Sequence, residues 1–121
     1  MARALAYEAR DAGSGARLAS HLRPAHTHWT RLRGLIGTAS LADGEGLWIR
    51  PCRQVHMFWM RYPIDVVFLD DAGRVVGLVE RLQPGRISPK FARAASVLEL
   101  PAGTIARSGV TPGATVHISR L

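Results

Sequence analysis

The amino-acid sequence predicts a mainly β (α+β) fold. We expect a single compact domain over residues 1–121, with several short, mostly antiparallel strands that form a barrel-like or sandwich core and one short helix. Short apolar runs such as DVVFL, RVVGLVERL and SVLEL are separated by turns that contain Gly or Pro. A length of 121 residues fits one domain. At 13.2 kDa, folding would bury about two-thirds of the unfolded surface, which is enough for a core without disulfides.

The N-terminal part is expected to hold two strands and the helix. Residues 2–8 and 16–22 are predicted as edge strands, separated by the turn-rich DAGSG. The stretch PAHTHWTRLRGLIG is predicted as the helix, because Pro24 suits a first helical turn and Gly37 a C-terminal stop. Three apolar residues at spacings of three and four would share its buried face: Trp29, Leu32 and Ile36.

The rest of the chain is expected to supply the other strands. GLWIRP is predicted as a strand that ends at Pro51, and VHMFWM as another that RYP interrupts. DVVFL, a continuous apolar run, is typical of a strand covered on both faces. DDAG would turn the chain through Gly73 into the strand RVVGLVERL. The loop QPGRISPKFARAA precedes SVLEL, a turn at PAG and, after TPG, the last strand ATVHISRL.

The chain is strongly basic, with a net charge of +7 and a pI of about 11.2. Such a charge points to nucleic acid as a partner. Two features weaken this interpretation. Every basic residue except Lys90 is Arg, which together with abundant Ala and Gly is typical of a GC-rich coding bias. The basic residues are also dispersed, without the Lys/Arg block of a binding arm.

Cysteine content and hydropathy indicate where such a chain would work. Cys52 is the single cysteine, so no internal disulfide can form and a reducing compartment is the simpler interpretation. The N-terminus MARALAYEARDAG has no apolar run of signal length. No stretch is long and apolar enough for a membrane span, so no membrane partner is expected. We therefore expect a cytoplasmic protein.

The segment PCRQVHMFWMRYPID, residues 51–65, holds the densest set of chemically distinctive side chains. Neither side of a strand built from it would be cleanly polar, so it is expected to be buried or to cover a pocket. Phe58 and Trp59 are predicted as core residues, because large apolar side chains are usually buried.

Cys52 and His56 could in principle be metal ligands or a nucleophile and its base. A metal needs three or four donors, and one C-x-x-x-H spacing has no second pair. A Cys–His enzyme needs a thiolate, an orienting group and an oxyanion site. No G-x-S-x-G elbow, P-loop, dinucleotide fingerprint or H-E-x-x-H occurs. We expect no metal and no cofactor, and a small hydrolase or transferase using Cys52 or His56 remains an alternative.

Two carboxylates lie in apolar surroundings. Asp65 opens an apolar strand, which is costly unless the carboxylate accepts hydrogen bonds or meets a cation. It would either cap the backbone of the preceding turn or pair with Arg33, Arg61 or His56 at a pocket rim. Glu99 poses the same question within VLEL, with simple exposure as a further alternative.

The order of several motifs resembles the domain-of-unknown-function family 192, also called uncharacterised protein family 0127. The motifs are RLRGLIG, the run from GEGLWI through PIDVVFLD, LQPGR, VLELPAG and a final G-x-x-V, over about residues 17–118. The resemblance implies a small, mainly β domain with no agreed activity or cofactor. Met57 stands where the family usually has Thr, and many relatives carry a secretory signal that this sequence lacks. Polar positions that match the family are Arg33, Cys52, His56, Asp65, Arg86 and Glu99.

The favoured function is a binding module for a small molecule or a protein, with a pocket near His56 and Asp65. The main alternative is single-stranded nucleic-acid binding by the aromatic and Arg-rich segment 48–62. The sequence does not indicate an oligomeric state. The candidate ligand-binding residues are His56, Asp65, Arg33, Arg86, Glu99, Cys52 and Trp59.

Overall fold

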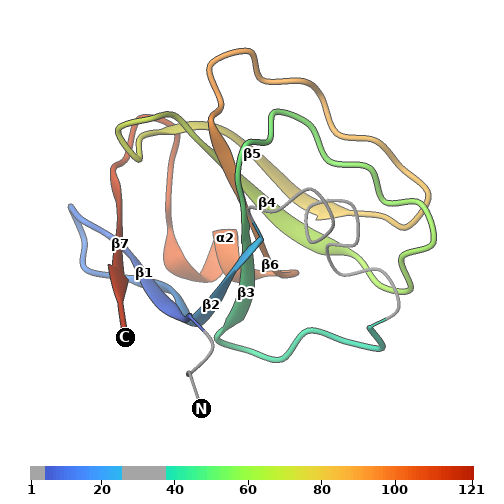
Figure 1. Ribbon diagram of the computed structural model, residues 1–121, viewed down its shortest axis with the longest axis horizontal. Coiled ribbons are helices and arrows are strands. Elements are labelled where there is room, and N and C mark those ends of the chain that lie inside the picture. Colours follow the sequence, from blue (N-terminus) through green and yellow to red (C-terminus); the bar gives the residue numbers. More distant parts are fainter. Residues whose placement is uncertain (1–4, 26–37) are drawn as a thin grey trace.

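The computed structural model describes residues 5–25 and 38–121, and all strands in this part of the chain join one seven-stranded mixed sheet (Figure 1). The sheet curls into a half-barrel and forms a single compact domain, so the mainly β prediction is confirmed. The elements are β1 (Tyr7–Asp11), β2 (Arg17–Ala25), β3 (Glu45–Ile49), β4 (Ile64–Leu69), β5 (Val75–Leu82), β6 (Ser96–Pro101), α2 (Thr104–Ser108) and β7 (Val116–Arg120).

The strand order is β5-β4-β6-β3-β2-β1-β7. Every neighbouring pair is antiparallel except β2 and β3, which run parallel from His21 opposite Glu45 to Ala25 opposite Ile49. The prediction of mostly antiparallel strands therefore holds. The strands β4 and β6 are the second and third from the β5 edge of the sheet and are buried along their whole length.

The two edge strands, β5 and β7, meet at one end of the half-barrel. Arg74 and Thr115 form an isolated antiparallel bridge there. The amide of Val75 donates to the carbonyl of Ala114 at 2.8 Å, and the amide of Val116 donates to that of Gly73 at 2.8 Å. Gly73 has a φ of 81°, as predicted for the hairpin turn, and a Cβ there would lie 2.8 Å from the Val116 carbonyl oxygen. This contact closes the barrel at the end where the chain turns from β4 into β5.

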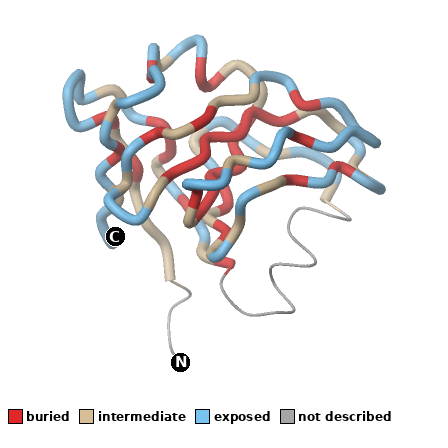
Figure 2. The backbone as a smooth tube through the Cα atoms, turned by 90° about the horizontal axis from the view of Figure 1, so that it is seen from above, coloured by how far each residue is buried: buried red, intermediate tan, exposed pale blue. Residues whose placement is uncertain are grey.

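The inside of the curve holds one apolar cluster, which we call the inner core. Alternate residues of the central strands point into it, and α2 contributes Ile105 from within the curve (Figure 1). Figure 2 shows buried stretches running through the middle of the molecule and exposed chain reversals at its periphery. The buried members are Ala9, Leu18, Ala19, Leu22, Val67, Leu69, Val75, Leu98, Leu100, Ile105, Val110 and Val116.

The opposite face of the same strands carries a second cluster, which we call the outer core. Two loops cover it, residues 50–63 and 83–95. Phe91 of the second loop packs on Phe68 of β4 with ring centroids 4.4 Å apart, and its ring fills the space where a Cβ on Gly77 would lie. The buried members are Ala25, Leu47, Ile49, Val55, Met57, Ile64, Val66, Phe68, Leu82, Ala94 and Val97.

The two covering loops hydrogen-bond to each other along their length without forming regular strands. The amide of Ser88 donates to the carbonyl of Val55 at 2.9 Å, and the amide of Met57 donates to that of Arg86 at 2.8 Å. The prediction of a regular strand over residues 55–60 is therefore wrong. The ladder is reduced to one bridge, between His56 and Ile87, and then breaks into a turn.

Other differences concern the ends of elements. The strand predicted over residues 2–8 is β1, which begins at Tyr7 and pairs on both sides, so it is not an edge strand. Pro24 and Ala25 belong to β2, because pairing with β3 extends that strand. The rest of the predicted helix lies outside the described residues. The sequence signalled a turn at PAG but not the one-turn helix α2 after it. No helix in the described ranges is long and apolar enough to cross a membrane.

Candidate functional site

The segment from Val55 to Trp59 alternates between the outer core and the solvent. Val55 and Met57 are buried, whereas Phe58 is 44 % exposed and Trp59 is 80 % exposed. The prediction that Phe58 and Trp59 are core residues is therefore wrong. The reason is local, because the chain turns at these two residues and carries their side chains away from the sheet that Met57 contacts.

Four exposed side chains form a surface that we call the aromatic tip: His56, Phe58, Trp59 and Ile87. The rings of His56 and Phe58 stack with centroids 6.0 Å apart and planes at 21°. The ring of Trp59 meets that of Phe58 edge-on, with centroids 6.3 Å apart. Ile87 faces His56 across the bridge between the loops and is 49 % exposed.

Backbone contacts hold the aromatic tip in place. The amide of Gly85 donates to the carbonyl of Met57 at 2.8 Å, and the amide of Met60 closes the turn on the same carbonyl at 3.3 Å. Trp59 has a φ of 62°, in the left-handed region that bulky residues rarely adopt. Arg61, two residues after Trp59, and Arg86, one residue before Ile87, are exposed and form no ion pair with any described residue.

Asp65 lies on the inner face of β4 and is fully buried. Its carboxylate accepts hydrogen bonds from the amides of Arg81 at 2.9 Å, Gly103 at 3.1 Å and Ile105 at 2.8 Å. These contacts attach the end of β5 and the first turn of α2 to the start of β4. The hydrogen-bonding role expected of Asp65 is present, but with distant backbone rather than with the preceding turn.

Glu99 lies on the outer face of β6 and is 6 % exposed, so the alternative of simple exposure is excluded. Leu47 and Val66 flank it on the neighbouring strands. Burial raises the pKa of the Glu99 carboxyl from 4.5 to about 7. Within residues 5–25 and 38–121 the side chain has no hydrogen bond or ion pair, which leaves burial as the cause of the raised pKa.

Cys52 is half-buried at the start of the first covering loop. Its thiol donates a hydrogen bond to the carbonyl oxygen of Gln54 at 3.2 Å. No cluster of three or more His, Cys, Asp or Glu side chains that could hold a metal ion occurs in the described part of the chain.

The predicted site residues thus lie in different places. His56, Trp59 and Arg86 come together at the aromatic tip. Asp65 points to the inner face of the sheet, whereas His56 belongs to a loop that covers the outer face, so the structure does not bring these two into one cavity. Glu99 faces the outer core, and Arg33 lies outside the described residues.

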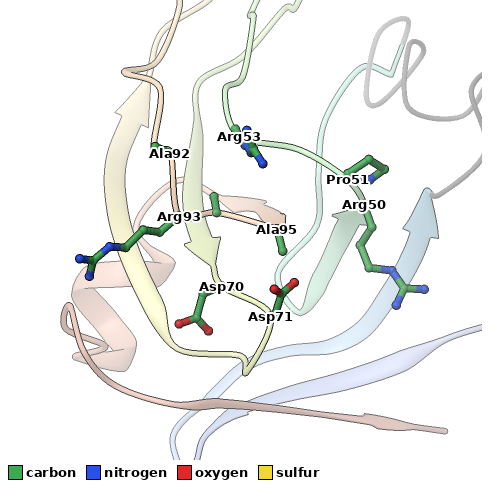
Figure 3. A pocket seen from close by; sticks show the side chains of 9 residues that line it. Arg50, Pro51, Arg53, Asp70, Asp71, Ala92, Arg93 and Ala95 are labelled. Atoms are coloured by element: carbon green, nitrogen blue, oxygen red, sulfur yellow. The ribbon is translucent and has the colours of Figure 1, made fainter.

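A polar hollow lies between the start of the first covering loop and the turn after β4 (Figure 3). Its volume is about 920 Å³, and its lining includes Arg50, Arg53, Asp70 and Asp71. The sequence carried one signal for it, because Arg50 and Arg53 belong to the aromatic and Arg-rich segment 48–62. The approach of the Asp-rich turn to Arg50 is a tertiary contact that no local pattern indicates.

A family model matches residues 9–118, described as the domain of unknown function DUF192, "Uncharacterized ACR". None of the curated proteins matches this chain significantly.

Two solved structures share the fold. One, a protein of unknown function from Novosphingobium aromaticivorans, has a TM-score of 0.80 at 23 % identity, with 93 % of this chain and 83 % of that chain covered. The other, described as a "putative transcription regulator" from Sinorhizobium meliloti, has a TM-score of 0.79 at 27 % identity, with 97 % of each chain covered.

Proposed function

The chain belongs to the uncharacterised DUF192 family, and we propose that this member is a binding module that meets its partner through the aromatic tip. The observation that carries the proposal is Trp59. This side chain is 80 % exposed, so it adds little to the stability of the isolated domain. Its left-handed backbone costs roughly 1–3 kcal/mol at a residue that is not Gly. A large apolar side chain held at such a cost is explained if a partner covers it.

The chemistry of the surface favours single-stranded nucleic acid as that partner. Three neighbouring rings, with centroids 6.0 Å apart for His56 and Phe58 and 6.3 Å apart for Phe58 and Trp59, are exposed, and stacking of a base on such a ring is worth roughly 1–3 kcal/mol. Arg61 and Arg86 flank the rings without a counter-ion in the described chain, and the whole chain carries a net charge of +7. The description of the Sinorhizobium meliloti protein as a "putative transcription regulator" supports testing this class first.

The proposal keeps part of the predicted pocket and reassigns the rest. His56, Trp59 and Arg86 belong to the binding surface. Asp65 acts as a structural anchor, because its carboxylate is used by three backbone amides. Cys52 is given no chemical role.

Binding of fluorescent single-stranded oligonucleotides, measured by anisotropy at two salt concentrations, tests the proposal. We expect binding that weakens steeply with salt, and a loss of about tenfold or more in affinity for Trp59→Ala. Arg86→Ala should weaken binding and lower the salt slope by about one. Leu121→Ala, which truncates another exposed apolar residue far from the tip in sequence, is the matched control and should leave the affinity unchanged.

Two results would contradict the proposal. Absence of binding at low salt to every homopolymer would remove nucleic acid as the partner class. Binding that Trp59→Ala and Phe58→Ala leave at full affinity would place the contact elsewhere on the molecule.

A further inference from the structure

The net charge of the protein is concentrated in the two covering loops. Residues 50–63 and 83–95 together contain six of the 16 Lys and Arg residues and none of the nine Asp and Glu residues. The rest of the chain is nearly neutral, because its ten basic residues are matched by nine acidic ones. The basic residues are dispersed in the sequence, and the fold gathers these six because both loops cover the same face of the sheet.

Five of the six basic side chains are available to a partner. The sixth, Arg50, is half-buried, and its guanidinium lies 4.0 Å from the centre of the Trp48 ring. The other five are exposed, and none of them forms an ion pair with a described residue. We call these five residues the basic layer: Arg53, Arg61, Arg86, Lys90 and Arg93.

Hydrogen bonds between the loops hold the basic layer in a fixed order. The pairing that begins beside the aromatic tip continues to the amide of Phe91, which donates to the carbonyl of Arg53 at 2.9 Å. Arg86 lies at the tip end of the layer, and Lys90 follows it along the second loop. Arg53 and Arg93 lie at the far end, where both line the polar hollow. The layer therefore leads from the exposed rings to the hollow.

Two carboxylates, Asp70 and Asp71, border the far end of the layer across the polar hollow (Figure 3). Asp70 is committed to its turn, because its carboxylate accepts from the amides of Ala72 at 2.9 Å and Arg74 at 2.8 Å. Neither carboxylate forms an ion pair with an arginine of the hollow. Three arginines against two carboxylates leave the hollow with an excess of positive charge.

We propose that the basic layer is the phosphate-binding part of the nucleic-acid site. A single strand stacks bases on the aromatic tip and runs its backbone along the covering loops to the polar hollow. The inference rests on the function proposed for the tip and adds three residues to it, Arg53, Lys90 and Arg93. Cations that follow one another along a surface suit a polyanion whose phosphates repeat along a line, because each phosphate accepts a charge-assisted hydrogen bond.

The length of the layer sets the length of the strand it can hold. Trp59 and Arg53 are six residues apart, a separation that an extended chain spans in at most about 22 Å. Phosphates of a stacked strand repeat about every 3.4 Å. A strand of about six nucleotides therefore reaches from the tip to the hollow, whereas three nucleotides on the tip do not.

Oligonucleotide length separates the two parts of the site. Binding of a dT trimer and a dT decamer to the full chain is measured by anisotropy over a range of salt concentrations. Each phosphate contact adds about 0.7 to the slope of log K against log salt for a single strand. We expect the slope for the decamer to exceed that for the trimer by about two. The slope is the decisive readout, because overlapping positions on a longer strand raise its affinity but leave its slope unchanged.

Variants assign the extra slope to the layer. Arg53→Gln and Arg93→Gln should each weaken decamer binding severalfold at low salt and lower its slope by about 0.7, while trimer binding stays as in the wild type. Arg107→Gln on α2 and Arg120→Gln on β7 are the matched controls, because they remove the same charge from exposed positions outside the loops. Both should leave the decamer slope unchanged. Trp59→Ala should weaken both lengths.

Failure of this inference and failure of the proposed function give different results. If neither oligonucleotide binds at low salt, the proposed function falls and the inference falls with it. If both lengths bind through Trp59 with equal salt slopes, the tip remains a binding site and the basic layer is not part of it. The same conclusion follows if Arg107→Gln lowers the decamer slope as much as Arg93→Gln does.

Vesicles of phosphatidylcholine and phosphatidylserine test the other kind of polyanionic partner. We expect them to bind more weakly than the decamer. Tighter binding to these vesicles than to the decamer, lost in Trp59→Ala, would assign the tip and the layer to an anionic membrane surface and overturn the inference.

Discussion

Asp65 and Glu99 are buried carboxyl groups on opposite faces of the sheet, and their surroundings treat them in opposite ways. Asp65, on the inner face, accepts three hydrogen bonds from backbone amides. Glu99, on the outer face, has no such partner in the described chain, and burial raises its pKa to about 7. Burial alone therefore does not tell what a carboxyl group does. The donors around it decide whether it anchors the fold or holds a proton near neutral pH.

The same contrast extends to what covers each face. The inner core is enclosed by strands and by α2, whereas the outer core is covered by two irregular loops. The exposed aromatic tip belongs to these loops on the outer side. Substitutions on the two faces test whether the faces also differ in how much their residues contribute to the free energy of unfolding.

The largest effect is expected from Asp65→Ala. The variant leaves three amides without their acceptor in a fully buried position, which should lower the free energy of unfolding by roughly 3 kcal/mol or more. Urea denaturation at pH 7 measures the loss. Asp71→Ala, on an exposed turn, is the control and should change stability by less than about 0.5 kcal/mol. A loss below about 1 kcal/mol for Asp65→Ala would mean that other acceptors or water replace the carboxylate.

At high pH, Glu99→Gln should raise the free energy of unfolding, whereas Asp65→Ala should lower it. The folded pKa of about 7 lies above the unfolded value of 4.5, so the folded state binds more protons between these two pH values. The contribution of Glu99 to the free energy of unfolding is therefore fully present below about pH 4.5. It is lost as the pH rises through 7, by roughly 3 kcal/mol in total. Glu99→Gln removes this dependence.

Thermal or urea unfolding of wild type and Glu99→Gln from pH 5 to pH 9 measures this pH dependence of the free energy of unfolding. The difference between the two proteins should grow in favour of the variant as the pH rises. Parallel pH profiles would show that the Glu99 carboxyl is already solvated or paired when it ionises.

Alanine substitutions at two glycines, one beside each core, compare how tightly the two cores are packed. A Cβ on Gly46 would lie 2.8 Å from a Leu100 methyl and 2.9 Å from a Leu22 methyl, inside the inner core. A Cβ on Gly77 would meet the ring of Phe91, which belongs to a covering loop. Overpacking costs roughly 1–3 kcal/mol, and we expect Gly46→Ala to lie at the upper end and Gly77→Ala at the lower.

Chemical denaturation ranks the two glycine variants, and limited proteolysis reports on the loop. Gly77→Ala should speed cleavage within residues 83–95, because Phe91 has to leave its position. An equal or larger loss of stability for Gly77→Ala would show that the loop is as firmly packed as the strands.

The smallest effect on stability is expected from Trp59→Ala, within about 0.5 kcal/mol of the wild type, because the side chain is largely exposed. Trp59→Gly removes the side chain and also relieves the positive φ of 62°, so it should be no less stable than Trp59→Ala. Thermal unfolding measures both. A loss above about 1 kcal/mol would mean that the indole packs on the domain and is not free for a partner.

The sequence by itself determined where most strands lie. DVVFL, RVVGLVERL, SVLEL, GLWIRP and VHISR became β4, β5, β6, β3 and β7, because a short apolar or alternating run between turn residues has few other ways to bury its side chains. The turn at Gly73 was also predictable from the sequence, because a tight hairpin turn needs a residue in the left-handed conformation.

Only the tertiary structure decided what the chemically distinctive residues do. The three amides that bind Asp65 belong to residues 16, 38 and 40 positions further along the chain, so no local pattern could reveal them. The exposure of Trp59 depended on a turn that interrupts the loop pairing, and the polar hollow on the fold placing Arg50 and Asp71 in one lining. Apolar periodicity is a property of neighbouring residues, whereas a site is made by residues that folding brings together.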